Sequence, residues 1–117
     1  MRPDTPENAP HSLALYEAIL RLNTLDDCVR FFDDLCAVTE LRTLEQRYDV
    51  AKCLLQGKVY SEIRRETGAS SATVSRVNRM LSYGAGRGLV AASVRYDLEQ
   101  EAAAPQSDPP ADDPCRN

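Results

Sequence analysis

Proline is absent from most of the sequence, since none lies between Pro10 and Pro105. The prolines therefore mark off one uninterrupted body, residues 12–101, from a head (residues 1–11) and a tail (residues 102–117). The head and the Pro-, Asp- and Ala-rich tail offer almost nothing to a hydrophobic core, so we expect both to be disordered. With 117 residues in all, the chain is long enough for one small domain and not for two.

Long apolar runs are also absent. No segment approaches the roughly 18 consecutive apolar residues of a membrane span, and the head lacks the apolar stretch of a secretory signal. We therefore expect a cytoplasmic protein without a membrane partner.

Residues typical of catalytic and metal sites are scarce, which argues against an enzyme. His11 is the only histidine and lies in the head, and no glycine-rich phosphate loop follows a strand. The cysteines lack the spacing of a zinc site, so we expect three small core residues and one free thiol in the tail: Cys28, Cys36 and Cys53, and Cys115. No cofactor or metal is predicted. The acidic pairs in residues 26–34 are interpreted as the solvated edge of a helix, with a weak cation site as the alternative.

Charge is distributed unevenly along the chain. The formal net charge is -4, yet residues 42–95 carry ten basic and four acidic groups. Residues 1–41 carry three basic and eight acidic groups, and residues 96–117 carry one and six. The acidic ends mask a basic middle, which indicates either a polyanionic partner or a solvated surface.

Helical periodicity predicts three helices in the first half of the body. They are HSLALYEAILRLN with Ser12 as its N-cap, TLDDCVRFFDDLCAV with Thr24 as its cap, and TELRTLEQRYDVAKCLLQG with Thr39 as its cap and Gly57 as its stop. The apolar stripe of the third comprises Leu41, Leu44, Tyr48, Ala51 and Leu55. Two of these helices carry more apolar surface than one stripe needs. We therefore expect the surplus surface to be buried against a second copy of the chain.

The segment VYSEIRRETGASSATVSRVNRMLS has the layout of a helix-turn-helix. It would comprise a helix of about residues 60–67, a turn at Gly68, Ala69 and Ser70, and a second helix of about residues 71–82. The glycine supplies the positive backbone dihedral of a tight turn, the alanine lets the helices approach, and the serine can cap the second helix. The expected inner faces hold Val59 and Ile63 in the first helix, and Val74, Val77 and Leu81 in the second.

The outer face of the second helix suits the major groove of DNA. It carries small residues near its start and arginines one turn on: Ala72, Ser75, Arg76, Arg79 and Tyr83. Small side chains permit close approach to base edges, and arginine can fork onto guanine or phosphate. Arg64, Arg65 and Lys58 would then meet the DNA backbone. The alternative is an ordinary amphipathic helix pair with solvated arginines. We expect a further helix after Gly88.

With these motifs the sequence resembles the Trp repressor family, through LLQG leading into YSEIRRETGASSATVSRVNRML. It is most similar to the YerC/YecD branch, which shares LYEAIL, RFFDDLC and the glycine-rich exit, and the resemblance covers about residues 13–88. The resemblance implies an all-helical, intertwined homodimer in which the N-terminal helices form a shared bundle and two helix-turn-helix heads project. It also implies a palindromic double-stranded DNA site with half-sites about one helical turn apart.

The resemblance assigns roles within the helix-turn-helix. The start of the second helix matches the family's base-reading positions, and two positions of the first helix match places near DNA. With the arginines of the pattern, the predicted DNA-binding residues are Ser61, Arg64, Arg65, Ser71, Ala72, Thr73, Ser75, Arg76 and Arg79.

The corepressor pocket is where the sequence departs from the Trp repressor itself. Arg76 matches the arginine that holds the amino-acid carboxylate, but the second pocket arginine aligns with Asp49, and the glycine that makes room for the indole aligns with Val77. A reversed charge and a filled space are both unfavourable to tryptophan. Arg76 and Asp49 are then interpreted either as a ligand site or as a salt bridge, and a phosphate contact of Arg76 is a third possibility.

The sequence therefore predicts a homodimeric, sequence-specific transcriptional regulator that binds duplex DNA without tryptophan and is not an enzyme. A repressor is favoured, and an activator stays open as the alternative. A small-molecule effector of unknown identity stays open. The alternative is a helical dimeric module that binds other proteins and shows no base preference toward DNA.

Overall fold

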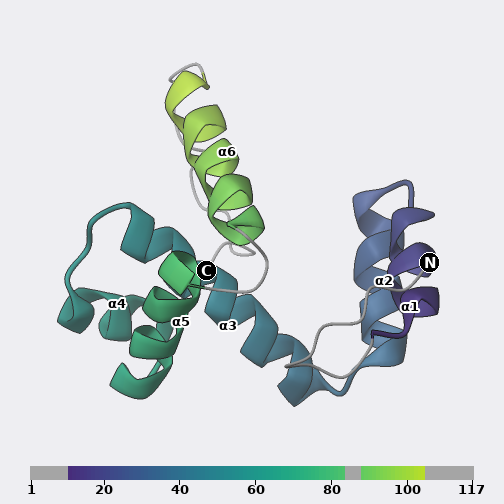
Figure 1. Cartoon of the computed structure of the whole chain (residues 1–117), viewed down its shortest axis with the longest axis horizontal. Coiled ribbons are helices and arrows are strands. Elements are labelled where there is room, and N and C mark those ends of the chain that lie inside the picture. The colour runs from purple at the N-terminus through teal and green to yellow at the C-terminus, as the bar shows by residue number, and fades with distance from the viewer. Residues whose placement is uncertain (1–10, 84–87, 105–117) are drawn as a thin grey trace, which may run out of the picture. The chain divides into compact units, whose positions relative to one another are not determined.

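The computed structural model describes residues 11–83 and 88–104, and every regular element in these ranges is an α-helix (Figure 1). The described helices are α1 (Leu13–Leu20), α2 (Leu25–Leu35), α3 (Val38–Leu55), α4 (Tyr60–Thr67), α5 (Ser71–Tyr83) and α6 (Leu89–Ala103). The all-α prediction is confirmed, as is the helix expected after Gly88. The predicted head and tail lie almost wholly outside the described residues, although α6 continues past residue 101. None of the described helices is both long and apolar enough to span a membrane.

The chain divides into two compact units, Met1–Leu44 and Glu45–Asn117, and the boundary falls inside α3. In the first unit Thr24 caps α2 as predicted, because its hydroxyl accepts a hydrogen bond of 3.0 Å from the amide of Asp27. Ser12 occupies the N-cap position of α1, but its side chain makes no capping hydrogen bond.

The predicted start of α3 is wrong by two residues. The helix begins at Val38, so Thr39 lies inside its first turn instead of capping it. The carboxylate of Glu40 accepts a hydrogen bond of 2.7 Å from the amide of Ala37. A first-turn acidic side chain therefore satisfies the amide that precedes the helix, which allows the helix to start earlier than the threonine suggested.

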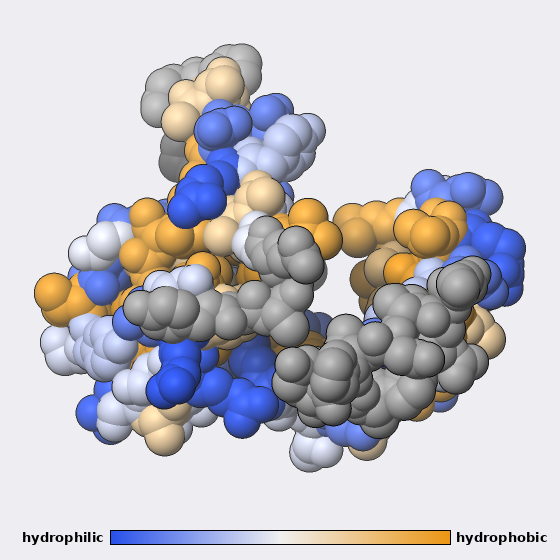
Figure 2. All heavy atoms as spheres, in the orientation of Figure 1, coloured by the Kyte–Doolittle hydropathy of each residue, from blue (hydrophilic) through white to orange (hydrophobic). Residues whose placement is uncertain are grey.

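The helices of the first unit bury no residue within the chain. Neither α1 nor α2 has a buried residue, and Cys28 and Cys36, which were expected in a core, are half-buried. Figure 2 shows hydrophobic residues at the surface of this unit. Large apolar side chains exposed on α1, α2 and the start of α3 are Leu15, Tyr16, Leu20, Leu25, Val29, Leu35, Val38 and Leu44. Leu20 and Leu25 are 84% and 81% exposed, which is unusual for leucines on neighbouring helices.

The second unit has a continuous apolar core. Its buried members come from α3, α4, the following turn, α5 and α6: Val50, Ala51, Cys53, Ile63, Ala69, Val74, Val77 and Val94. Cys53 is thus the predicted core cysteine that is buried in the chain. Val59, expected beside Ile63 on the inner face of α4, is 64% exposed because it precedes the helix as its N-cap residue.

Within this unit α3 uses two opposite faces. Gln46, Val50 and Cys53 share one face and contact the α4 side, whereas Tyr48 and Lys52 lie about 200° around the helix axis and contact α6. The predicted apolar stripe through Leu41, Leu44, Tyr48, Ala51 and Leu55 follows the second of these faces. The first face was not predicted.

Candidate nucleic-acid interface

Helices α4 and α5 pack side by side and form the predicted helix-turn-helix (Figure 1). Gly68 ends α4 in the left-handed conformation, with φ 75° and ψ 4°, and its amide donates a hydrogen bond of 2.9 Å to the carbonyl of Arg64. This is the positive dihedral that the turn was predicted to need. Ala69 is 4% exposed, so the chain passes close against the core before α5 begins.

Ser70 caps α5 as predicted. Its hydroxyl accepts a hydrogen bond of 3.1 Å from the amide of Thr73, and its carbonyl accepts one of 3.0 Å from the amide of Val74. The same hydroxyl donates to Oγ1 of Thr73 at 3.1 Å. The hydroxyl of Thr73, a predicted DNA contact, is therefore engaged in holding the start of α5. The exposed side chains around it are those of Ser71, Ala72 and Ser75.

The two faces of α5 differ as expected. Val74 and Val77 are 0% and 2% exposed, and Leu81 packs against the same core. The remaining predicted contacts are exposed on α4 or α5: Ser61, Arg64, Arg65, Ser71, Ala72, Ser75, Arg76 and Arg79. The side chain of Tyr83 lies outside the described part of the chain. The exposed sides of α4 and α5 therefore carry short side chains together with guanidinium groups.

The arginines of this surface have no intramolecular carboxylate partner in the part of the chain that the structure describes. The ion pairs found there are Arg30 with Asp26, Lys52 with Glu101, and Lys58 with Glu66. None involves the arginines of the candidate interface, which are Arg64, Arg65, Arg76 and Arg79. Their positive charge is therefore available to an external anion.

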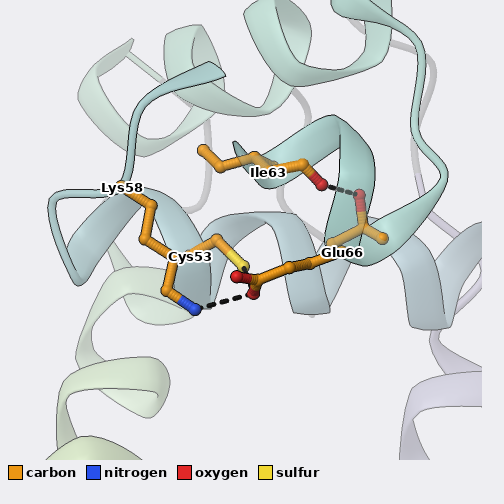
Figure 3. Close-up of polar contacts among 5 residues, drawn as sticks. Cys53, Lys58, Ile63 and Glu66 are labelled. Atoms are coloured by element: carbon orange, nitrogen blue, oxygen red, sulfur yellow. Dashed lines mark hydrogen bonds and ion pairs between the residues drawn. The ribbon is translucent and has the colours of Figure 1, made fainter. Parts of the chain in front are cut away.

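Lys58 differs from this group, although it was expected to meet the DNA backbone. Its Nζ lies 2.7 Å from Oε1 of Glu66, and the thiol of Cys53 approaches the same oxygen at 3.9 Å (Figure 3). The hydrogen bond from Lys58 lowers the pKa of Glu66 and raises that of Lys58 itself, and burial raises the pKa of the Cys53 thiol. Lys58 therefore connects the start of α4 to its last turn.

The structure leaves both predicted ligand residues at the surface of the chain. Arg76 and Asp49 are both exposed, and their salt bridge is not among the ion pairs between described residues. Val77 is part of the buried core. No group of three or more His, Cys, Asp or Glu side chains that could hold a metal occurs within residues 11–83 and 88–104.

Sequence reasoning missed Gln46, which the structure brings to this site. Its side-chain Nε2 donates a hydrogen bond of 3.1 Å to the carbonyl of Thr67, at the end of α4. A glutamine on a helix carries no apolar signal, so periodicity assigned it to the solvent. Its position four residues before Val50, on the face of α3 that packs against the helix-turn-helix, is the signal that could have found it.

Comparison with known proteins gives consistent matches. The sequence profile described as Trp repressor protein matches residues 11–90. The uncharacterized protein YerC of Bacillus subtilis (strain 168) is 53% identical over 70 residues, which are 60% of this chain and 67% of that protein.

Two crystal structures are similar to the chain over most of its length. A provisionally assigned Trp repressor from Staphylococcus aureus superposes with a TM-score of 0.63 at 40% identity, covering 80% of this chain and 87% of that one. A TrpR-like protein from Eubacterium eligens ATCC 27750 gives a TM-score of 0.64 at 39% identity, covering 80% and 90%. Both the sequence and the fold are therefore similar to those of proteins described as Trp repressors or as TrpR-like.

Proposed function

This chain belongs to the Trp repressor family, and on that premise we propose that it is a sequence-specific DNA-binding transcriptional regulator of the repressor type. It binds palindromic duplex DNA as a homodimer, through the helix-turn-helix of α4 and α5. The observation that carries the proposal is the outer surface of this pair, where small exposed side chains adjoin four arginines without intramolecular carboxylate partners in the described part of the chain.

The start of α5 is the part of the surface suited to reading bases. Ser71, Ala72 and Ser75 are exposed and short, so the helix backbone can approach base edges in the major groove. The hydroxyls of the two serines can donate or accept a hydrogen bond there. Thr73 contributes through the cap and is the least available of the predicted contacts.

The arginines supply the charge that DNA binding needs. Arg64 and Arg65 lie in the last turn of α4, and Arg76 and Arg79 lie on α5. Neutralising phosphates with such groups releases counterions and provides the sequence-independent part of the affinity. The overall net charge of -4 does not oppose this, because the acidic groups are concentrated in other segments.

A second copy of the chain is the partner proposed for the first unit. The helices α1 and α2 have no buried residue and expose a series of large apolar side chains, which a monomer would leave in water. Two copies related by a two-fold axis present two identical heads, which explains why the DNA site should be a palindrome.

Tryptophan is not the proposed corepressor. Val77 is buried in the core and Asp49 places a carboxylate where the family's pocket has a cation, so neither shape nor charge favours an amino acid there. A different small-molecule effector is compatible with the proposal. The proposal includes no catalytic activity, and it places the protein in the cytoplasm with its DNA.

Selection of bound duplexes from a random DNA pool tests the proposal directly. The purified full-length protein is used at near-physiological salt without added ligand, and its oligomeric state is measured by sedimentation in the same buffer. Enrichment of a palindrome is the expected result. An intact dimer that enriches no sequence would contradict the proposal as stated, binding without an added ligand, and would point either to a missing effector or to the alternative, a dimeric module that binds other proteins.

A further inference from the structure

Gln46 connects α3 to the turn of the helix-turn-helix. Its Nε2 donates a hydrogen bond of 3.1 Å to the carbonyl of Thr67, the last residue of α4, and the bond is partly buried. The carbonyls in the last turn of a helix have no partner within the helix, so this bond satisfies an acceptor that would otherwise need water. No other side chain of α3 bonds to residues 67–70 in the described part of the chain.

The other hydrogen bonds of the turn are local. Oγ1 of Thr67 donates to the carbonyl of Ile63 at 2.7 Å and accepts from the amide of Ala69 at 3.1 Å. Together with the left-handed Gly68, these bonds define the shape of the turn. They do not reach α3, so they cannot orient the turn against it.

The apolar core does not fix the orientation of the turn against α3 either. Val50 of α3 is buried with Ile63, Ala69 and Val74, which holds the helices together. Burial of apolar surface is non-directional, however, and tolerates small rotations and slides. The directional contact between α3 and the turn is the hydrogen bond of Gln46. Its Nε2 also lies 3.9 Å from the place where a Cβ on Gly68 would stand, so the amide sits directly over the turn.

We propose that Gln46 is a positioning residue for DNA recognition: its side-chain amide fixes the turn against α3 and thereby sets the direction in which α5 presents its outer face. This inference rests on the proposed function. Because α5 starts three residues after Gly68, a change in the turn moves the whole of α5. Base contacts require close alignment, whereas phosphate contacts on flexible arginines tolerate small displacements.

The test compares Gln46→Met with the wild-type protein and with Gln56→Met. Methionine preserves the length and volume of the side chain but removes the donor. Gln56 is exposed just after α3, and its side chain makes no hydrogen bond to another described residue, so it is a matched control. Sedimentation of each variant confirms that the dimer is retained.

Two measurements decide the question. Amide hydrogen exchange of residues 67–71 is measured without DNA, and the dissociation constants for the selected palindrome and for an unrelated duplex are measured at one salt concentration. With Gln46→Met we expect exchange to accelerate and binding of the palindrome to weaken by about three- to tenfold. Binding of the unrelated duplex should stay as in the wild type.

Unchanged exchange in Gln46→Met would overturn the inference, because the turn would then be held without the amide. Faster exchange with unchanged binding of the palindrome would overturn it as well, since the turn would not govern recognition. Equal weakening toward both duplexes would indicate a general loss of affinity rather than of orientation, and would also contradict it. A wild-type protein without any sequence preference would refute the proposed function before a variant is compared, and the inference with it.

The Gln46→Glu variant separates a hydrogen bond from packing. At neutral pH its carboxylate would face the carbonyl of Thr67, and two acceptors repel each other. We therefore expect a larger loss of palindrome binding than with Gln46→Met. A purely space-filling role predicts that both variants behave like the wild type, and that result would reject the inference.

Discussion

The hydroxyl of Tyr48 in α3 donates a hydrogen bond of 2.7 Å to the carboxylate of Asp97 in α6, 49 residues further along the chain. The hydroxyl of Ser93 lies 2.8 Å from the hydroxyl oxygen of Tyr48, and Lys52 pairs with Glu101 one turn on. These contacts form a polar row between α3 and α6, on the face of α3 opposite the helix-turn-helix. The last described helix is thus fastened to the same helix that supports the candidate interface.

Removing the hydroxyl in Tyr48→Phe should destabilise the fold by about 1 to 2 kcal/mol, because Asp97 and Ser93 lose a common partner. Unfolding in denaturant at a fixed protein concentration measures this loss. Tyr96 of α6 is 61% exposed, so Tyr96→Phe should leave stability within about 0.5 kcal/mol of the wild type. Equal effects of the two variants would show that the polar row does not stabilise the chain.

The ion pair of Lys58 predicts how DNA binding responds to salt. Lys58 is neutralised by Glu66, whereas Arg64 has no such partner among the described residues. In a homodimer, Arg64→Met removes two phosphate contacts, so the slope of log affinity against log salt should become shallower by about 1.8. Lys58→Met should leave the slope nearly unchanged. Titrations at several salt concentrations measure both, and similar slope changes would contradict this division of roles.

Substitutions on the outer face of α5 should separate base reading from charge. Ser75→Ala or Ala72→Leu should change which sequences are preferred, since both side chains are exposed at the start of the helix. Arg79→Ala should weaken binding to all duplexes alike if the guanidinium meets phosphate. Repeating the selection from a random pool with each variant tests this. If none altered DNA binding while fold and dimer survived, the placement of α5 in the groove would be wrong.

Gly68→Ala should cost about 1 to 2 kcal/mol of stability through its backbone alone. Gly68 has φ 75°, and an added Cβ would meet no atom closer than 3.9 Å, so strain and not a clash is the cause. Gly57 has φ 82° with nothing within 4 Å, and Gly57→Ala is therefore a control of similar cost. Denaturant unfolding should give similar losses for the two. Affinity for the selected palindrome should fall more for Gly68→Ala, because only that residue lies in the turn before α5.

Acid should remove the contribution that the ion pair between Lys58 and Glu66 makes to the stability of the fold. The hydrogen bond from Lys58 holds the pKa of Glu66 below its ordinary value of 4.5. A carboxyl whose pKa is lower in the folded state stabilises the fold above its unfolded pKa and loses that effect as pH falls through the folded pKa. The stability advantage of the wild type over Glu66→Gln should thus be present at about pH 6 and shrink below about pH 4.5. A constant difference across this range would contradict the pKa shift.

Much of the second unit followed from the sequence because its signals are local. The left-handed Gly68, the Ser70 cap and the inner face of Val74 and Val77 were each predicted, and the structure contains all of them. A helix that packs on one side has one apolar stripe, and periodicity finds it. The same reasoning placed Val59 inside although it is exposed, because it lies before the helix where the period no longer applies.

The remaining contacts could not be predicted, because they depend on how far long polar side chains extend and on a helix that packs on two sides. Gln46 and Lys58 are polar and look solvated in a sequence, yet their long side chains extend to Thr67 and Glu66. Helix α3 packs on both sides, so a search for a single stripe finds one face and assigns the other to water. The expected pairing of Arg76 with Asp49 came from an alignment, which carries no side-chain geometry.

Because α3 serves the helix-turn-helix with one face and α6 with the opposite face, its length is constrained by rotation. One residue inserted between Gln46 and Tyr48 would turn Gln46 by about 100° relative to Tyr48 and the residues after it, so that its amide would no longer face the carbonyl of Thr67. An insertion of seven residues would restore the rotation to within about 20° while displacing the partners by two turns. The middle of α3 should therefore accept substitution far more readily than any change in length.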